Sequence, residues 1–186
     1  MHESSRIESS RVVRYNFTVI NQMSACLTAH LLSCLLVLPS LAGAAPPTTL
    51  AVTGAVKTPL SLSAADVKAL PRTTVQAEDA DRTVTYEGVL VGEILARAGV
   101  ALGDALRGDA VASYVVAHAA DGYRAVFALA ELDNAFVKND VLVADTADGK
   151  PLFAYQGPWR LVAPRDQRGA RSVRMLDRLE VVRLPR

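Results

Sequence analysis

Short runs of alternating, β-branched residues recur from residue 50 to residue 184, and turn-forming glycine, proline or aspartate separates most of them. A period of two is typical of strands that bury one face, so these runs limit the fold more than any other feature. The predicted strands are "LAVTGAV", "RTTVQA", "RTVTYEG", "ASYVVAHA", "YRAVFAL", "DVLVAD" and "LDRLEVVRL". The acidic stretch "EDAD", Glu78 to Asp81, is expected to be the turn between the second and third strands.

Two short helices are expected among these strands. In "LSLSAADVKALP", Ser63 can cap a helix, Asp66 completes a capping box three residues later, and Pro71 ends the helix. The segment "VLVGEILARA", residues 89–98, has an amphipathic pattern that ends at Gly99. Dominant strands with short interrupting helices predict an α+β fold with a mixed, curved β-sheet.

The first 44 residues are typical of a signal peptide rather than of a folded segment. A basic leader precedes the uncharged apolar run "LLSCLLVLPSLA", and the small residues of "AGA" then favour cleavage after Ala44. The alternative is an uncleaved anchor, because residues 23–45 lack charge and approach the length of a membrane span. Cleavage predicts a periplasmic or secreted protein without a membrane partner, with a linker at 45–50 and a domain at 51–186.

Cysteine and charge exclude several functions for the expected mature chain. Cys26 and Cys34 both precede residue 45, so residues 45–186 contain no disulfide, no thiolate metal ligand and no cysteine nucleophile. Acidic and basic side chains balance after residue 44. A neutral, exported chain is not expected to bind nucleic acid.

Arginines are concentrated near the C-terminus, in "GPWRLVAPRDQRGARSVRML". From residue 157 to residue 186, eight arginines face three acidic side chains. Such a patch is either a binding site for an anion or a solvated surface that contributes little beyond solubility. We favour the anion site.

Several motifs in order resemble the molybdopterin-binding domain of the sulfite oxidase family. They are "VTGAVKTPLSLSAADVKALP", "YEGVLVGEILARAGV", "ADGYRAVFALAEL", "DGKPL" and "GPWRLVAP" followed by "GARSVRML". The resemblance runs from about residue 52 to residue 182 and implies the sulfite oxidase-type α+β fold, built around curved β-sheet. It covers one domain, and the immunoglobulin-like dimerisation domain of full-length sulfite oxidases is not expected here.

The resemblance also implies a cofactor site. The family binds the phosphate of molybdopterin with a glycine, basic, serine, basic segment, which Gly169, Arg171, Ser172 and Arg174 match. Arg160, after "GPW", matches a further basic position. One guanidinium group can donate two parallel hydrogen bonds to two oxygens of a phosphate, and a serine hydroxyl adds a further donor. We therefore expect these three arginines and Ser172 to line one pocket, with Gly169 allowing the turn that brings them together.

One departure from the family bears on its chemistry. A cysteine thiolate that binds molybdenum is expected just after "RTTVQA", where this chain has "AEDADRTVTYEG". Asp79 or Asp81 could offer an oxygen ligand, but two aspartates in a polar turn are more often solvated. Without the thiolate we expect no molybdenum, no catalytic residue and no metal ligand in this chain.

Three functions follow from this pattern. The first is an exported, non-catalytic module that binds a phosphorylated, pterin-like anion or a periplasmic protein partner. The second is a molybdenum-pterin oxidoreductase that transfers oxygen atoms with an unusual ligand set, and the third is an interaction protein with an empty pocket. His118 is expected to be hydrogen-bonded structure, and Trp159 and Tyr155 are expected to pack at the edge of the core.

Overall fold

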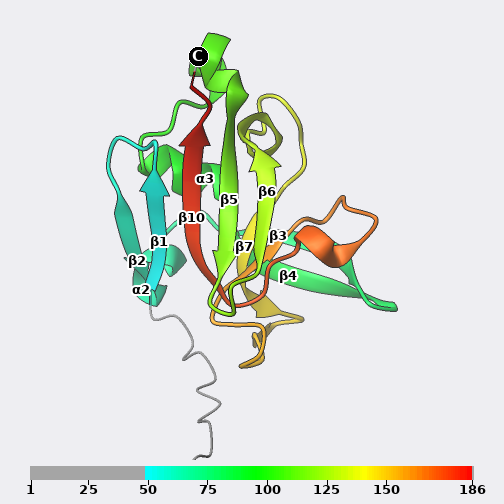
Figure 1. The fold of residues 1–186 in the computed structure, drawn as a ribbon. Helices are drawn as coiled ribbons and strands as arrows, with labels where there is room; N and C mark the ends of the chain where they lie inside the picture. Colours follow the sequence, from blue (N-terminus) through cyan, green and yellow to red (C-terminus); the bar gives the residue numbers. More distant parts are fainter. Residues whose placement is uncertain (1–48, 186) are drawn as a thin grey trace, which may run out of the picture. The chain divides into compact units, whose positions relative to one another are not determined.

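A five-stranded sheet with the order β2-β1-β10-β5-β6 forms one half of the fold in the computed structural model, which describes residues 49–185. Its strands are β1 (Thr49–Gly54), β2 (Leu60–Ser63), β5 (Ser113–Ala119), β6 (Arg124–Ala128) and β10 (Leu176–Arg183). β1 and β10 are parallel, whereas the other pairs are antiparallel, so the sheet is mixed. β1, β10, β5 and β6 lie side by side in Figure 1.

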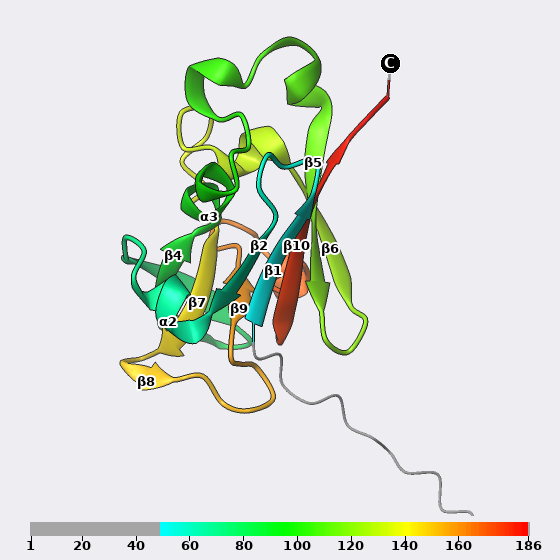
Figure 2. The same cartoon turned by 90° about the vertical axis from the view of Figure 1, so that its left-hand side faces the viewer.

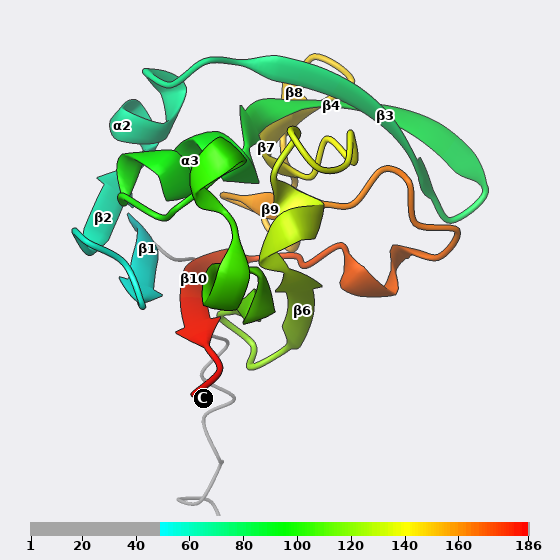
Figure 3. The ribbon, with the colours of Figure 1, turned by 90° about the horizontal axis from the view of Figure 1, so that it is seen from above.

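A second sheet forms the other half, with the order β3-β4-β7-β8 and with β9 paired to β7. It contains β3 (Thr73–Asp79), β4 (Arg82–Leu90), β7 (Leu142–Ala147), β8 (Lys150–Pro151) and β9 (Arg160–Val162). β4 and β7 lie apart from β1, β10 and β6 in Figure 2, and Figure 3 shows β3 and β4 on the side opposite β10 and β6. The space between the sheets is filled by the main core.

The two predicted helices are present. α2 (Ala64–Lys68) begins at Ser63, which forms the predicted capping box with Asp66. The Asp66 carboxylate accepts hydrogen bonds from the hydroxyl and the backbone nitrogen of Ser63, and these bonds lower its pKa. α3 (Val91–Arg97) has its C-cap at Ala98 and is followed by Gly99, whose φ of +74° is a conformation that favours glycine.

The main core takes one face from each sheet and the inner side of α3. Leu50 of β1, Val115 of β5 and Leu179 of β10 face Val143 of β7 and Ile94 of α3, and each of these side chains is fully buried. A smaller cluster packs on the other face of the second sheet, around Val84, Tyr86, Leu142, Ala144 and Val162. Apolar residues on both faces of β7 explain the apolar run 142–144 at its start.

The predicted α+β class and all of the predicted strands are confirmed, with three differences in detail. Glu78 and Asp79 belong to β3, so the turn between β3 and β4 is only residues 80–81. Val89 and Leu90 extend β4 instead of starting the helix. β2, β8 and β9 were not predicted, because they are two to four residues long and lie beside stronger helix or turn signals.

The N-terminal predictions fall mostly outside the described residues. The signal peptide at 1–44 and residues 45–48 of the linker are not described. β1 begins at Thr49, so the last two residues of the expected linker are already part of a strand. No helix among residues 49–185 is long and apolar enough to cross a membrane.

Candidate functional site

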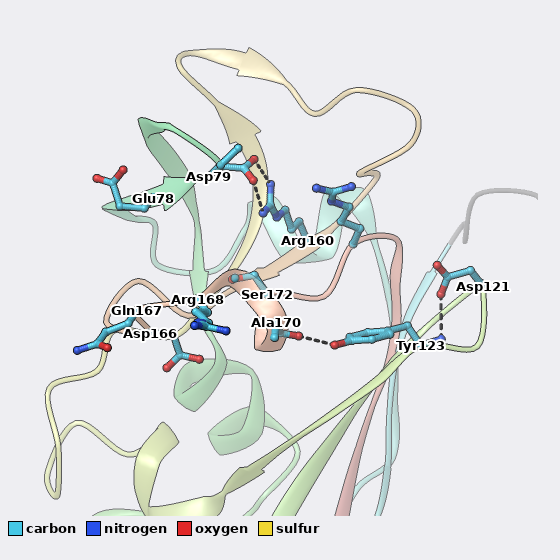
Figure 4. Close-up of a pocket in the computed structure, with 13 residues that line it drawn as sticks. Glu78, Asp79, Asp121, Tyr123, Arg160, Asp166, Gln167, Arg168, Ala170 and Ser172 are labelled. Carbon is cyan, nitrogen blue, oxygen red and sulfur yellow. Dashed lines mark hydrogen bonds and ion pairs between the residues drawn. The ribbon is translucent and has the colours of Figure 1, made fainter.

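A cavity of about 520 Å³ lies where three segments of the chain meet. These are the tip of the β3–β4 hairpin, the β5–β6 turn and the segment between β9 and β10 (Figure 4). We call it the arginine cavity, and its lining residues are Glu78, Asp79, Ala80, Asp121, Tyr123, Arg160, Asp166, Gln167, Arg168, Gly169, Ala170, Ser172 and Arg174. Three arginines of the arginine-rich segment line it, Arg160, Arg168 and Arg174.

Arg160 reaches the cavity from β9 and is held there by an ion pair. Its Nη1 donates to Oδ2 of Asp79 at 2.7 Å, and its Nη2 lies 3.3 Å from Oδ1 of Asp79 (Figure 4). Nη1 also donates to Oη of Tyr86 at 2.7 Å. The Arg160 side chain is only 5% exposed, and that of Asp79 is 20% exposed. Tyr86 also donates to Asp79 at 3.0 Å, and the Arg160 guanidinium lies 5.1 Å from the centre of the Tyr86 ring. These contacts form a closed, charge-balanced network.

The network shifts two ionisations in opposite directions. Hydrogen bonds from Arg160 hold the pKa of the Asp79 carboxyl below its ordinary value. Burial raises the pKa of the Tyr86 phenol to about 12. At neutral pH, Asp79 is therefore an anion and Tyr86 keeps its proton. The Nε of Arg160 is buried without a hydrogen-bond partner in the described part of the chain.

Arg171 points elsewhere. Its Nε and Nη2 donate to the two carboxylate oxygens of Asp166, both at 2.8 Å, and its Nη1 lies 3.3 Å from Glu131. The guanidinium stacks 4.7 Å from the centre of the Phe127 ring. The bond to Asp166 raises the pKa of Arg171, so its charge is fixed and is already balanced by two acids. Arg171 thus joins η4 (Leu129–Leu132) to the loop before η5 (Gly169–Arg171).

Arg168 and Arg174 are the cations of the arginine cavity that remain available. Both are exposed, and among residues 49–185 no carboxylate lies within ion-pair distance of either guanidinium. The Arg174 guanidinium lies 5.6 Å from the centre of the Tyr155 ring. Ser172 accepts a hydrogen bond from the Ala163 backbone at 3.2 Å, which leaves its own hydroxyl hydrogen free to bind a ligand.

Tyr123 connects the β5–β6 turn to the arginine segment. Its hydroxyl donates to the backbone carbonyl of Ala170 at 2.6 Å, and its backbone nitrogen donates to Asp121 at 2.9 Å (Figure 4). The ring is about half exposed, so it forms part of the cavity wall. The contact fixes one side of the cavity to the first sheet.

Three of the four predicted site residues therefore share one cavity. Arg160, Ser172 and Arg174 line it, whereas Arg171 is not among its lining residues. The predicted convergence of Arg171 and Arg174 is not observed, because acids from η4 and from the preceding loop bind Arg171. Gly169 begins a 3-10 turn without a positive φ, so its expected special conformation is not used either.

Two residues of the site, Asp79 and Arg168, were not predicted from the sequence. Asp79 was expected in a solvated turn, which was wrong, since it ends β3 and binds Arg160. A signal was present: Asp79 continues the alternation of Val75 and Ala77 on the inward face of β3. Arg168 carried no signal that distinguished it from the other arginines in the segment. His118, in contrast, is hydrogen-bonded structure as predicted, to Glu180 and Arg178.

Residues 42–186 match the model of the oxidoreductase molybdopterin binding domain family. The chain belongs to this family. The match agrees with the resemblance to the sulfite oxidase family and confirms the predicted fold. A search of curated proteins found no match.

Among solved structures, the sulfane dehydrogenase SoxCD from Paracoccus pantotrophus shares the fold. The comparison gives a TM-score of 0.58 and 24% sequence identity, and it covers 72% of this chain. It covers only 37% of the SoxCD chain, so this member of the molybdopterin binding domain family spans little more than a third of that protein. The likeness supports the sulfite oxidase-type fold and carries no statement about activity.

The family implies molybdopterin, and the donor groups of the cavity fit only part of that cofactor. Arg168, Ser172 and Arg174 offer donors suited to a phosphate. A thiolate for molybdenum cannot come from residues 45–186, which contain no cysteine. Asp79 is engaged by Arg160 and Tyr86, and no three histidine, cysteine or acidic side chains gather as metal ligands within residues 49–185. The site fits an anionic ligand and does not fit molybdenum held by a protein thiolate.

Proposed function

We propose that this domain is a non-catalytic binding module of its family, and that it holds a phosphorylated, pterin-like anion in the arginine cavity. The observation that carries the proposal is the pair of arginines, Arg168 and Arg174, which line a cavity of about 520 Å³ without a carboxylate partner in the described residues. Ser172 adds a neutral donor beside them. A protein partner with an anionic side chain would use the same donors.

Charge within the cavity separates structural arginines from binding arginines. Arg160 is neutralised by Asp79, and Arg171 is neutralised by Asp166 and Glu131. A bound anion would have to displace one of these acids to reach either guanidinium, which costs the desolvation of the displaced charge. Arg168 and Arg174 can bind an anion without displacing an acidic side chain. They are therefore the residues on which anion affinity should depend.

Calorimetric titration with a pterin monophosphate tests the proposal, with the unphosphorylated pterin as the matched ligand. We expect the Arg168→Gln/Arg174→Gln double variant to lose at least about tenfold in affinity, because one charge-assisted hydrogen bond contributes about 1.5 kcal/mol or more. Arg165→Gln is the control, since Arg165 belongs to the same segment and does not line the cavity. Equal affinity for the two pterins, or an unchanged double variant, would contradict the proposal.

We propose in addition that the protein is exported and that its mature form begins at Ala45. The support is the basic leader, the apolar run and the small-residue exit of residues 1–44. Terminal sequencing and intact mass of the protein from a periplasmic or culture fraction test this proposal. A chain that keeps its leader in the membrane fraction would contradict cleavage and favour the anchor.

A further inference from the structure

A second cavity, of about 490 Å³, adjoins the arginine cavity, and we call it the aromatic cavity. Asp79, Ala80 and Arg174 line both cavities. The remaining walls come from β4, from the β7–β8 hairpin and from the loop between β8 and β9: Arg82, Val84, Tyr86, Ala147, Asp148, Lys150, Pro151, Phe153, Tyr155 and Gln156. None of these remaining residues lines the arginine cavity.

Two stacked aromatic rings form one side of the aromatic cavity. Phe153 and Tyr155 are 65% and 58% exposed, and they are among the large hydrophobic side chains most exposed in the described residues. Their ring centres lie 5.8 Å apart, and their planes differ by 11°. A stacked pair that presents this much apolar surface to solvent beside a cavity gains from covering by another flat ring.

The rest of the lining includes apolar and cationic side chains. Val84, which is buried, and Pro151, which is exposed, both line the cavity. The Arg174 guanidinium lies 5.6 Å from the centre of the Tyr155 ring and so places positive charge at the end of the stack. A ligand ring on this surface would lie within reach of a cation.

The acids of the aromatic cavity are already engaged. Asp148 lies 3.3 Å from Arg82 and accepts a hydrogen bond from the Thr85 backbone at 3.0 Å. Asp79 is bound by Arg160. Lys150 is exposed at the β7–β8 hairpin, and no carboxylate of residues 49–185 lies within ion-pair distance of its ammonium group. The unbalanced charge of the lining is positive.

We infer that the aromatic cavity is a binding site for a planar aromatic anion, which stacks on Phe153 and Tyr155 and places its negative group near Lys150. The flat rings select a planar ligand over a saturated one of equal size. The unpaired ammonium selects an anion over a neutral ligand. Phe153, Tyr155 and Lys150 line only the aromatic cavity, whereas Arg174 lines both cavities, so variants of the first three residues test the aromatic cavity without changing the lining of the arginine cavity.

The test is a titration of the folded protein with 2-naphthoate, followed by calorimetry, with decahydronaphthalene-2-carboxylate as the saturated ligand of matched charge. We expect 2-naphthoate to bind and the saturated acid to bind at least about tenfold more weakly. The Phe153→Leu/Tyr155→Leu double variant should lose at least about tenfold in affinity for 2-naphthoate, and Lys150→Gln should lose several-fold. Both rings are exposed, so far-UV circular dichroism should show that the double variant stays folded.

Arg165→Gln is the matched control, since Arg165 lines neither cavity. Its affinity for 2-naphthoate should equal that of the unchanged protein. Absence of 2-naphthoate binding, equal binding of the saturated acid, an unchanged double variant, or a loss in Arg165→Gln that matches the loss in the double variant would each overturn the inference. Pterin phosphate binding is measured with different variants, so either proposal can fail without the other.

Discussion

The role of each arginine depends on which acids the fold brings beside it. Arg160 and Arg171 carry the same charge as Arg168 and Arg174, but they are bound by Asp79 and by Asp166 with Glu131. Of these acids, only Asp166 belongs to the arginine-rich segment. In the folded domain, acidic side chains of β3 and η4 therefore neutralise part of the excess positive charge of residues 157–186.

The contact between Asp79 and Arg160 makes a testable contribution to stability. We expect Asp79→Asn to lower the free energy of unfolding at pH 7 by about 2 to 3 kcal/mol, because it leaves a buried guanidinium without its counter-ion. The figure is at the low end for a buried pair, since Asp79 keeps some contact with solvent. Urea denaturation measures it, and Glu78→Gln, which changes an exposed acid on the same strand, is the control.

The same variant predicts a pH dependence. The pKa of Asp79 is lower in the folded protein than the ordinary value of 3.8, so its contribution is complete well above that value and is lost as the pH falls through the folded pKa. The stability difference between the unchanged protein and Asp79→Asn should therefore shrink below about pH 4. A difference that stayed constant down to pH 2 would show that the loss does not come from the charge of Asp79.

At the scale of elements, local sequence signals decided most of the fold. The capping box of Ser63 and Asp66 and the helix end at Gly99 were readable because each depends on a few neighbouring residues. β8 and β9 were not predictable, because they are defined by hydrogen bonds to β7. A segment of two or three residues contains no sequence pattern that indicates such pairing. The ion pair between Arg171 and Glu131 was not predictable for the same reason, because Glu131 belongs to a different segment of the chain.

The end of α3 offers a prediction at this scale. Gly99 has a φ of +74°, and a Cβ built there would lie 2.8 Å from Cβ of Lys57. Gly149, in the β7–β8 turn, has a nearly equal φ of +72°, and a Cβ there would meet nothing within 4 Å. Alanine at either position should cost about 1 kcal/mol of left-handed strain, and Gly99→Ala should cost more because Lys57 must also move. Denaturant unfolding of both variants measures the difference, and equal losses would contradict the steric part of the argument.

At the scale of the whole molecule, family membership and site chemistry point to different activities. The fold and the order of motifs were predictable because strand alternation and turns run through the whole domain. The cavity was only partly predictable, since it joins the ends of β3, the β5–β6 turn and the β9–β10 segment. The family model describes an oxidoreductase domain that binds molybdopterin, whereas residues 45–186 contain no cysteine that could give molybdenum a thiolate ligand. The binding proposal itself rests on Arg168 and Arg174, which line the arginine cavity without a carboxylate partner in the described residues.

Elemental analysis separates these two activities directly. We expect protein purified from a host that makes the molybdenum cofactor to contain far less than one molybdenum per chain, because Asp79, the carboxylate at the tip of the β3–β4 hairpin, is already bound by Arg160 and Tyr86. A sulfite oxidase-family enzyme that keeps its cysteine, produced in the same host, is the control for cofactor loading. One molybdenum per chain together with oxygen-atom transfer would establish the oxidoreductase with an unusual ligand set, whereas a phosphorylated pterin retained without metal would match the donors of Arg168, Ser172 and Arg174.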